Sequence, residues 1–326
     1  MPAGASVMRL TAEPDPFGRM HEALDISVPR DENGAIDQAI PTLPASASLT
    51  DDAGLVYYQA PSGWRLLDLT EIWNYRELIW SLAARDLKVR YRQTAVGVIW
   101  AILQPLAMMT IFTVMFRLMG RAPVEEGVPY VVAVLCGLLP WQLFAATLSN
   151  ASESLVNHQS LITKVYFPRA VLPISAMLGG VVDFSISLSL LAVALLWFGI
   201  APTWAMLLIP VFSLLALLAS LAASLWLSAL NAIYRDVRYV VPFVLQVGFF
   251  VSPVVYETDA LIPPGYRLIY ALNPMVGVID GLRWAVLGHT PPAVAPMLIS
   301  LGCLFAVLLS GMAYFRQVER HLADRI

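Results

Sequence analysis

Few residues of this 326-residue chain could do chemistry, and they are scattered. The two lysines, Lys88 and Lys164, do not follow a glycine-rich loop, so the G-x-x-x-x-G-K-[ST] pattern that cradles nucleotide phosphates is absent. The histidines lack the spacing of metal ligands or of a base beside a nucleophile. They are His21, His158, His289 and His321. We therefore expect no catalytic constellation, no metal site and no cofactor on this chain.

One acid falls deep inside an apolar segment. Asp183 lies roughly 20 Å from the start of the segment 170–198, at the helical rise of 1.5 Å per residue. A charge at that depth in lipid is costly, so the carboxyl is expected to be neutral or paired. A hydrogen bond to another span is the structural interpretation, and a substrate hydroxyl acceptor or a proton-coupled group is the functional one. The same two interpretations apply to three glutamines, which could hydrogen-bond either a substrate or a neighbouring helix: Gln104, Gln142 and Gln246.

The composition indicates that most of the chain is surrounded by lipid rather than water. Hydrophobic residues make up 58% of the sequence and charged residues 13%, whereas soluble domains average about 45–50% and about 25%. Apolar runs of 18 or more residues are long enough to cross a hydrocarbon core about 30 Å thick. We predict an all-α membrane protein with six transmembrane helices, in which Cys136 and Cys303 act as small apolar groups. The predicted spans are 95–117, 128–148, 170–198, 204–230, 239–256 and 294–315.

The basic residues predict the orientation of these spans. Four arginines fall on one side, Arg117, Arg121, Arg267 and Arg283, and eleven basic residues fall on the other. The positive-inside rule therefore places both termini in the cytosol, which agrees with an even number of spans and with the absence of a signal-peptide pattern. The eleven are Arg85, Lys88, Arg90, Arg92, Lys164, Arg169, Arg235, Arg238, Arg316, Arg320 and Arg325.

Residues 1–60 have a different composition from the rest. They contain six prolines, nine acids and three arginines without a sustained apolar period, so they could bury too little surface to offset ordering entropy. We predict a disordered acidic cytosolic tail, which is either a dispensable extension or a docking segment for a partner. The charge pattern makes nucleic acid an unsuitable partner.

Residues 61–94 are predicted to form an amphipathic interface helix. Asp68 and Glu71 resemble a capping pair, and the helix is expected to run to Arg92. We expect this helix to lie in the membrane surface, with its basic end against anionic headgroups; an ordinary cytosolic helix is the alternative. The polar stripe comprises Glu77, Ser81, Arg85, Lys88 and Arg92, with Arg90 also at the basic end, and the apolar face comprises Ile72, Tyr75, Ile79 and Leu82.

The segment 257–293 is too polar to cross the membrane and too apolar for an ordinary loop. The stretches 268–272 and 276–287 each have a helical pattern, and they meet at Asn273 and Pro274. We predict two short re-entrant helices on the non-cytosolic face, with a surface-lying hairpin as the alternative. Asp280 and Arg283, three residues apart, are expected to form a local helix pair.

Four blocks of this sequence, in order, resemble the membrane permeases of bacterial polysaccharide-exporting ABC transporters, which belong to the ABC-2 membrane-component superfamily. The resemblance runs from about residue 64 to the end and leaves residues 1–60 outside it. The blocks are RDLKVRYRQTAVGVIWAILQPL at 85–106, LITKVYFPR at 161–169, LNAIYRDVR at 230–238, and FVSPVVY at 250–256 with LNPM at 272–275.

This resemblance implies a homodimer of six-span subunits in the bacterial cytoplasmic (inner) membrane. Each subunit would sit on a separate nucleotide-binding ATPase subunit, so that ATP and Mg²⁺ are bound by the partner. A lipid-linked or reducing-end-capped glycan, such as O-antigen, capsule or teichoic acid, would move outward through the dimer interface, surrounded by membrane lipids.

Two cytosolic segments are the expected contacts with that ATPase. The segment 157–167, ended by Pro168, has the form of a short rigid lever between two spans, and 234–236 would form a smaller second contact. Inert connecting loops are the alternative for both. The lever residues are Asn157, Gln159, Leu161, Lys164, Tyr166 and Phe167, and the second set is Tyr234, Arg235 and Asp236.

A path for a sugar polymer needs aromatic side chains and few charges, because sugars present apolar ring faces and hydroxyl edges. Each such residue is alternatively a core residue or an interfacial anchor. A secondary transporter is a rival function, but the chain lacks duplicated halves. A membrane-embedded glycan-modifying enzyme is the other, but Asp183 has no evident partner in the sequence. The path candidates are Trp100, Trp141, Phe144, Phe243, Phe249, Phe250, Tyr256, Tyr270 and Trp284.

Overall fold

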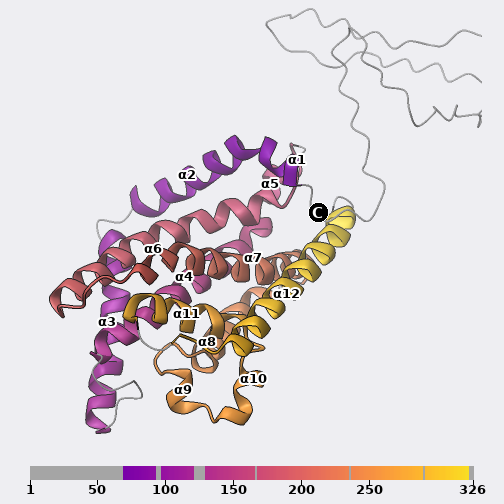
Figure 1. Cartoon of the computed structure of the whole chain (residues 1–326). Coiled ribbons are helices and arrows are strands. Elements are labelled where there is room, and N and C mark those ends of the chain that lie inside the picture. Colours follow the sequence, from indigo (N-terminus) through magenta and orange to yellow (C-terminus); the bar gives the residue numbers. More distant parts are fainter. Residues whose placement is uncertain are drawn as a thin grey trace, which may run out of the picture. The chain divides into compact units, whose positions relative to one another are not determined.

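The computed structural model describes residues 69–92, 97–120, 129–165, 167–234, 236–288 and 291–322. The chain divides into two units, residues 1–62 and 63–326, and every described residue belongs to the second. The predicted acidic tail at 1–60 thus lies outside the described residues. Within the described ranges every regular element is a helix, which confirms the all-α prediction (Figure 1).

Five stretches of helix in the described residues are long and apolar enough to cross a membrane. They correspond to five of the six predicted spans, and the fourth begins with a short 3₁₀ turn, η1 (Trp204–Leu208). Its main helix, α7, follows directly. The long helices are α3 (Gly97–Leu118), α4 (Tyr130–Asn157), α6 (Val171–Trp197), α7 (Ile209–Ile233) and α12 (Val294–Leu322).

The predicted fifth span, 239–256, is represented by a shorter helix, α8 (Val237–Val251). The helix stops at Val251 because Ser252 precedes Pro253, and the residue before a proline is driven to an extended backbone, here φ −99° and ψ 151°. Fifteen residues rise only about 22 Å, less than the hydrocarbon thickness of about 30 Å. A sixth crossing therefore stays a prediction.

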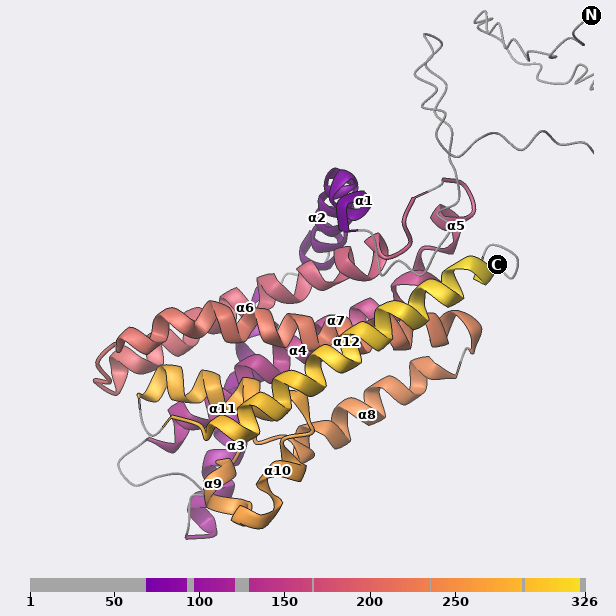
Figure 2. The same ribbon diagram turned by 45° about the vertical axis from the view of Figure 1, so that its right-hand side comes forward.

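Helix α4 is the centre of this unit and packs against α6, α7 and α11 (Pro274–Leu287) (Figures 1 and 2). Small and hydroxylated residues allow the close approach: Thr147 Oγ1 donates a hydrogen bond to Ser220 Oγ at 2.7 Å. On the α6 side, a Cβ added to Gly180 would lie 2.5 Å from Thr147 Cγ2. Because lipid gives helices little hydrophobic reason to associate, such packing and interhelical hydrogen bonds stabilise the bundle.

The predicted interface helix is present as two helices, α1 (Leu69–Asn74) and α2 (Arg76–Arg92). The chain turns at Tyr75, whose N–H donates to Ile72 O at 3.1 Å, so one continuous helix was the wrong prediction. Asp68, the expected cap, lies outside the described residues. Helix α2 lies along α6 (Figures 1 and 2).

The predicted lipid-facing side of this segment packs on protein instead. Ile72 and Leu82 are buried in a cluster with side chains of α6, α7 and α12, because those helices offer a complementary apolar surface. Trp73 and Trp80, seven residues apart, are each 69% exposed. These two indoles and the exposed Val89, rather than the predicted apolar face, are the large apolar groups of α1 and α2 available to a membrane interface.

The segment 257–293 contains the two expected helices, which appear as α10 (Arg267–Tyr270) and α11, after α9 (Thr258–Leu261) and the 3₁₀ turn η2 (Pro264–Tyr266). Two hydrogen bonds of Asn273 stabilise the predicted junction between these two helices. Asn273 Oδ1 accepts from Met275 N at 3.0 Å, and its Nδ2 donates to Ser252 Oγ at 2.9 Å. That these helices re-enter the membrane stays a prediction.

The contact of α4 with the chain that follows α8 generates a stability prediction. A Cβ added to Gly137 would lie 2.0 Å from Val254 O, so Gly137→Ala must displace backbone. We expect a loss of about 1–3 kcal/mol in the free energy of unfolding, measured by denaturant titration in detergent micelles. Gly302→Ala is the matched control, since its added methyl meets no atom within 4 Å. Equal effects of the two substitutions would contradict the predicted close packing.

Candidate functional site

The main candidate site is a cavity of about 530 Å³ among α2, α3, α4, α6 and α8. Four helices contribute most of its wall, and Phe249 represents α8. Its lining is mainly apolar, with a few amide and hydroxyl groups and a single pair of opposite charges. Pockets of this kind bind largely apolar ligands through a few well-placed polar groups.

Aromatic rings form one part of this wall. Trp141 of α4 is 6% exposed, and its ring centroid lies 6.1 Å from that of Phe249 and 5.4 Å from that of Phe144. Trp100 of α3 lines the same cavity but is 60% exposed, so the cavity reaches the outer surface of α3 there. The cavity wall thus contains three of the nine aromatic residues predicted for a sugar path, and a fourth, Phe144, packs against Trp141.

Neutral polar groups form another part. Gln104 of α3, named from the sequence, lines the cavity, and so do Gln142, Ser149 and Asn150 of α4. Ser149 and Asn150 were missed by sequence reasoning. They follow Gln142 at seven and eight residues, a spacing that places all three on one face of a helix and was the available signal.

The one charged pair joins α2 to α6. Arg90 Nη1 lies 2.9 Å from Asp183 Oδ2, and the Tyr91 hydroxyl donates a hydrogen bond to Asp183 Oδ1. Burial, together with this hydrogen bond, raises the pKa of Tyr91 to about 12, which keeps the phenol protonated as a donor. Asp183 is paired, as expected, but its partners come from the interface helix and not from another span. Gly179 of α6 lies beside this contact, and a Cβ added to it would lie 3.8 Å from Arg90 Nη1, an ordinary van der Waals distance.

The other predicted path residues lie elsewhere. Phe243, Phe250 and Gln246 are on the exposed face of α8 and do not line the cavity. Tyr256 and Tyr270 are hydrogen-bonded to each other through their hydroxyls at 2.8 Å, in the segment after α8. Trp284 packs edge-on against Trp204, with ring centroids 6.4 Å apart. These residues therefore belong to surfaces and contacts separate from the cavity.

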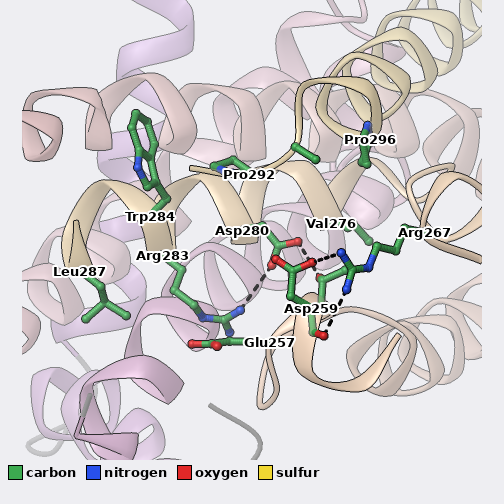
Figure 3. A pocket seen from close by; sticks show the side chains of 12 residues that line it. Glu257, Asp259, Arg267, Val276, Asp280, Arg283, Trp284, Leu287, Pro292 and Pro296 are labelled. Atoms are coloured by element: carbon green, nitrogen blue, oxygen red, sulfur yellow. Dashed lines mark hydrogen bonds and ion pairs between the residues drawn. The ribbon is translucent and has the colours of Figure 1, made fainter. Parts of the chain in front are cut away.

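A smaller pocket of about 90 Å³, with five charged residues in its lining, lies between α9 and α11 (Figure 3). Asp280 accepts from Thr258 Oγ1 at 2.6 Å and from Arg283 Nη1 at 3.3 Å, which confirms the predicted pair. Arg283, 6% exposed, also donates from Nη2 to Pro253 O at 2.8 Å. This guanidinium therefore ties α11 to the chain leaving α8. Among the described residues, no group of three or more His, Cys, Asp or Glu side chains could hold a metal ion.

The predicted lever contains a short helix, α5 (Gln159–Ile162). Asn157, Gln159 and Lys164 are exposed, and Leu161 packs partly against the cluster beneath the segment. Phe167 corrects the prediction of a docking contact, because its ring is 5% exposed within that same cluster. It anchors the segment to the bundle instead.

The remaining expected contacts are partly described. Tyr234 is 61% exposed and Asp236 is exposed, while Tyr166 and Arg235 lie outside the described residues. At the expected basic end of α2, Lys88 is exposed, and the side chain of Arg92 is outside the described part of the chain. Arg85 pairs with Asp86 at 2.9 Å, and its Nη2 also contacts Nε2 of His158. Helix α2 is thereby joined to the junction of α4 and α5.

Comparison with known proteins gives a consistent family. Residues 77–287 match the ABC-2 type transporter family. The O-antigen export system permease protein RfbA of Myxococcus xanthus is 31% identical over 257 residues, which cover 78% of this chain and 98% of that protein. RfbA of Klebsiella pneumoniae is 27% identical over 255 residues, covering 76% and 94%. The polysialic acid transport protein KpsM of Escherichia coli is 23% identical over 246 residues, covering 73% and 92%.

The pocket between α9 and α11 generates a pH prediction. Burial raises the pKa of Asp280 from 3.8 to about 6, although Arg283 and the Thr258 hydroxyl favour the charged form. The folded state therefore prefers the protonated acid. This stabilisation is present below pH 3.8 and is lost as the pH rises through about 6.

We expect the α11 amides to exchange hydrogen faster at pH 7.5 than at pH 5, after correction for intrinsic exchange. Asp280→Asn is expected to remove most of this difference in exchange rate. Asp259→Asn, at a side chain 64% exposed, is the control that should retain most of it, because burial raises the pKa of Asp280 more than the charge of Asp259 does. Unchanged pH dependence in Asp280→Asn would refute the assignment.

Proposed function

This chain belongs to the ABC-2 type transporter family, and we propose that it is the membrane permease subunit of an ATP-driven polysaccharide exporter. Its substrate would be a lipid-linked or end-capped polysaccharide that crosses the bacterial cytoplasmic membrane. The relatives that match it over most of their length carry names of O-antigen and polysialic acid export. The proposal extends that role to this chain.

The observation that carries the substrate class is the lining of the cavity. Trp100, Trp141 and Phe249 offer ring faces, while Gln104 and Asn150 offer neutral donors and acceptors. Sugars present apolar faces and hydroxyl edges, so this combination suits them, and the near absence of charge suits a polymer that must slide. Asp183 is held by Arg90 and Tyr91, which argues against the free carboxyl that a proton-coupled transporter or a glycan-modifying enzyme would use.

ATP hydrolysis is assigned to a separate subunit, which would bind ATP and Mg²⁺. The 326 residues contain no G-x-x-x-x-G-K-[ST] sequence, so this chain has no phosphate-binding loop of that type. The exposed residues of the α5 segment, with Tyr234 and Asp236 as a second contact, form the proposed docking surface. Because α5 continues from α4, movement of the docked ATPase would reach the cavity wall through α4.

The proposed assembly is a homodimer seated on two ATPase subunits. Helix α3 leaves most of its apolar surface uncovered, with Ile111 59% exposed, and α8 does the same at Phe243, 65% exposed. A second copy or lipid must cover both faces in a membrane. We further propose that α8 with the residues after it makes the sixth crossing, that α10 and α11 re-enter from the non-cytosolic side, and that both termini are cytosolic.

A gene deletion tests the function as a whole. Cells that lack the chain should lose surface polysaccharide and should accumulate lipid-linked polymer in the cytosol, because synthesis continues without a route outward. The measurement is immunoblotting of surface glycan together with extraction of the lipid-linked pool. Restoration by the full chain is the control. Intact surface glycan with no accumulated polymer would remove the proposal.

A pair of substitutions tests the docking surface. Lys164→Glu reverses an exposed charge and should reduce the ATPase subunit that copurifies with the chain several-fold, with thermal unfolding unchanged. Phe167→Ala empties a buried site and should instead lower stability by about 3–5 kcal/mol. Copurification and unfolding are measured on both variants. Normal ATPase association in Lys164→Glu would exclude this segment as the docking surface.

A further inference from the structure

Arg90 and Asp183 are the only charged side chains among the described residues that line the large cavity. Around them the lining is apolar, aromatic, or neutral and polar. A ligand that fits this lining is therefore largely uncharged and carries no more than a compact charged group. The position of the pair then decides where that group would sit.

Arg90 lies at the end of α2, on the cavity wall. Its side chain is 49% exposed even with the carboxylate of Asp183 in contact, whereas that of Asp183 is 21% exposed. A second anion can therefore approach the guanidinium from the cavity side. The planar guanidinium presents several N–H donors in a fixed fork, which suits the two oxygens of a phosphate better than a point charge would.

Asp183 keeps one hydrogen-bond partner if its contact with Arg90 is lost. The Tyr91 hydroxyl donates to Asp183 Oδ1, the oxygen that Arg90 does not contact. Exchange of one anion for another on Arg90 thus avoids the large penalty of an unpaired buried carboxylate. A phosphate group carries at least as much charge as a carboxylate and has more acceptor oxygens, so it can compete for the same guanidinium.

The surroundings indicate what is attached to the phosphate. Gln104, Gln142 and Trp141 line the same cavity and suit a sugar. Trp100 lines the cavity and is also largely exposed, next to Ile99, which is 57% exposed on α3. An apolar chain attached to the phosphate could therefore stay along the outer surface of α3 while the sugar enters.

We propose that Arg90 binds the phosphate that joins lipid to glycan in the substrate, and that Asp183 occupies Arg90 until substrate displaces it. This inference rests on the proposed function, which supplies the lipid-linked glycan. It assigns opposite roles to the two members of one ion pair. Arg90 is the substrate contact, and Asp183 is its competitor.

Opposite responses of the two residues test the proposal. The full chain in phosphatidylcholine nanodiscs is titrated with a fluorescent short-chain polyprenyl diphosphate. We expect Arg90→Gln to weaken binding about tenfold or more and Arg90→Lys to weaken it less, because lysine keeps the charge and loses the fork. Asp183→Asn should strengthen binding about threefold or more, since the competing charge is gone. Arg76→Gln removes a charge from the other end of α2 and should change nothing.

Three further binding measurements distinguish a phosphate contact from other causes of probe binding. The matching polyprenol, which has no phosphate, should bind equally to the native chain and to Arg90→Gln. Inorganic pyrophosphate should compete weakly, because it lacks the lipid. Competition by phosphatidylglycerol as strong as that by the polyprenyl diphosphate would overturn the proposal in favour of a general anionic-lipid contact.

A purely structural ion pair predicts a different pattern. Arg90→Gln and Asp183→Asn would then weaken binding and lower the unfolding temperature together, and the double variant would recover neither, which would overturn the proposal. If the deletion strain loses surface glycan while binding is indifferent to Arg90, the phosphate assignment fails and the exporter stands. If surface glycan is intact in the deletion strain, the proposed function itself fails, whatever the binding result.

Discussion

The close packing of α4 against its neighbours is the constraint on which the rest of this structure depends. Thr147 contacts Ser220 on one side and approaches Gly180 on the other, and Gly137 lies against the backbone at Val254. Larger side chains at these points would separate the helices. With α4 fixed, its remaining face at Trp141 and Gln142 becomes a rigid wall of the cavity, and its C-terminal end becomes the base of α5.

Helix α2 connects the two ends of this arrangement. Arg85 reaches His158 at the junction of α4 and α5, and Arg90, five residues later, reaches Asp183 on α6. Five residues span about 7.5 Å of helix, so the two contacts lie close together on one short stretch of α2. The same helix packs its apolar face on the bundle and turns Trp73 and Trp80 outward. Helix α2 thus contributes to the cavity wall and also contacts the start of the proposed docking segment at His158.

The sequence predicted the helices well because their pattern is local. The long apolar runs, the helical junction at Asn273 and the pair of Asp280 with Arg283 each depend on residues close in the chain. Helix α8 departs from prediction, since hydropathy continues past Val251 while the backbone turns before Pro253. A hydropathy window averages across such a break and therefore cannot detect it.

By itself, the sequence determined that most of the chain is apolar enough to lie in lipid, where its helices run, that Asp183 needs a partner, and that the G-x-x-x-x-G-K-[ST] pattern does not occur. Tertiary structure alone decided that this partner is Arg90, that Phe167 is an anchor rather than a contact, and that Trp100, Trp141 and Phe249 share one cavity while Phe243 does not. The physical reason is that composition and period report which faces of a helix are apolar. Which apolar face meets which neighbour depends on shape complementarity between segments far apart in the chain, and no local pattern encodes it.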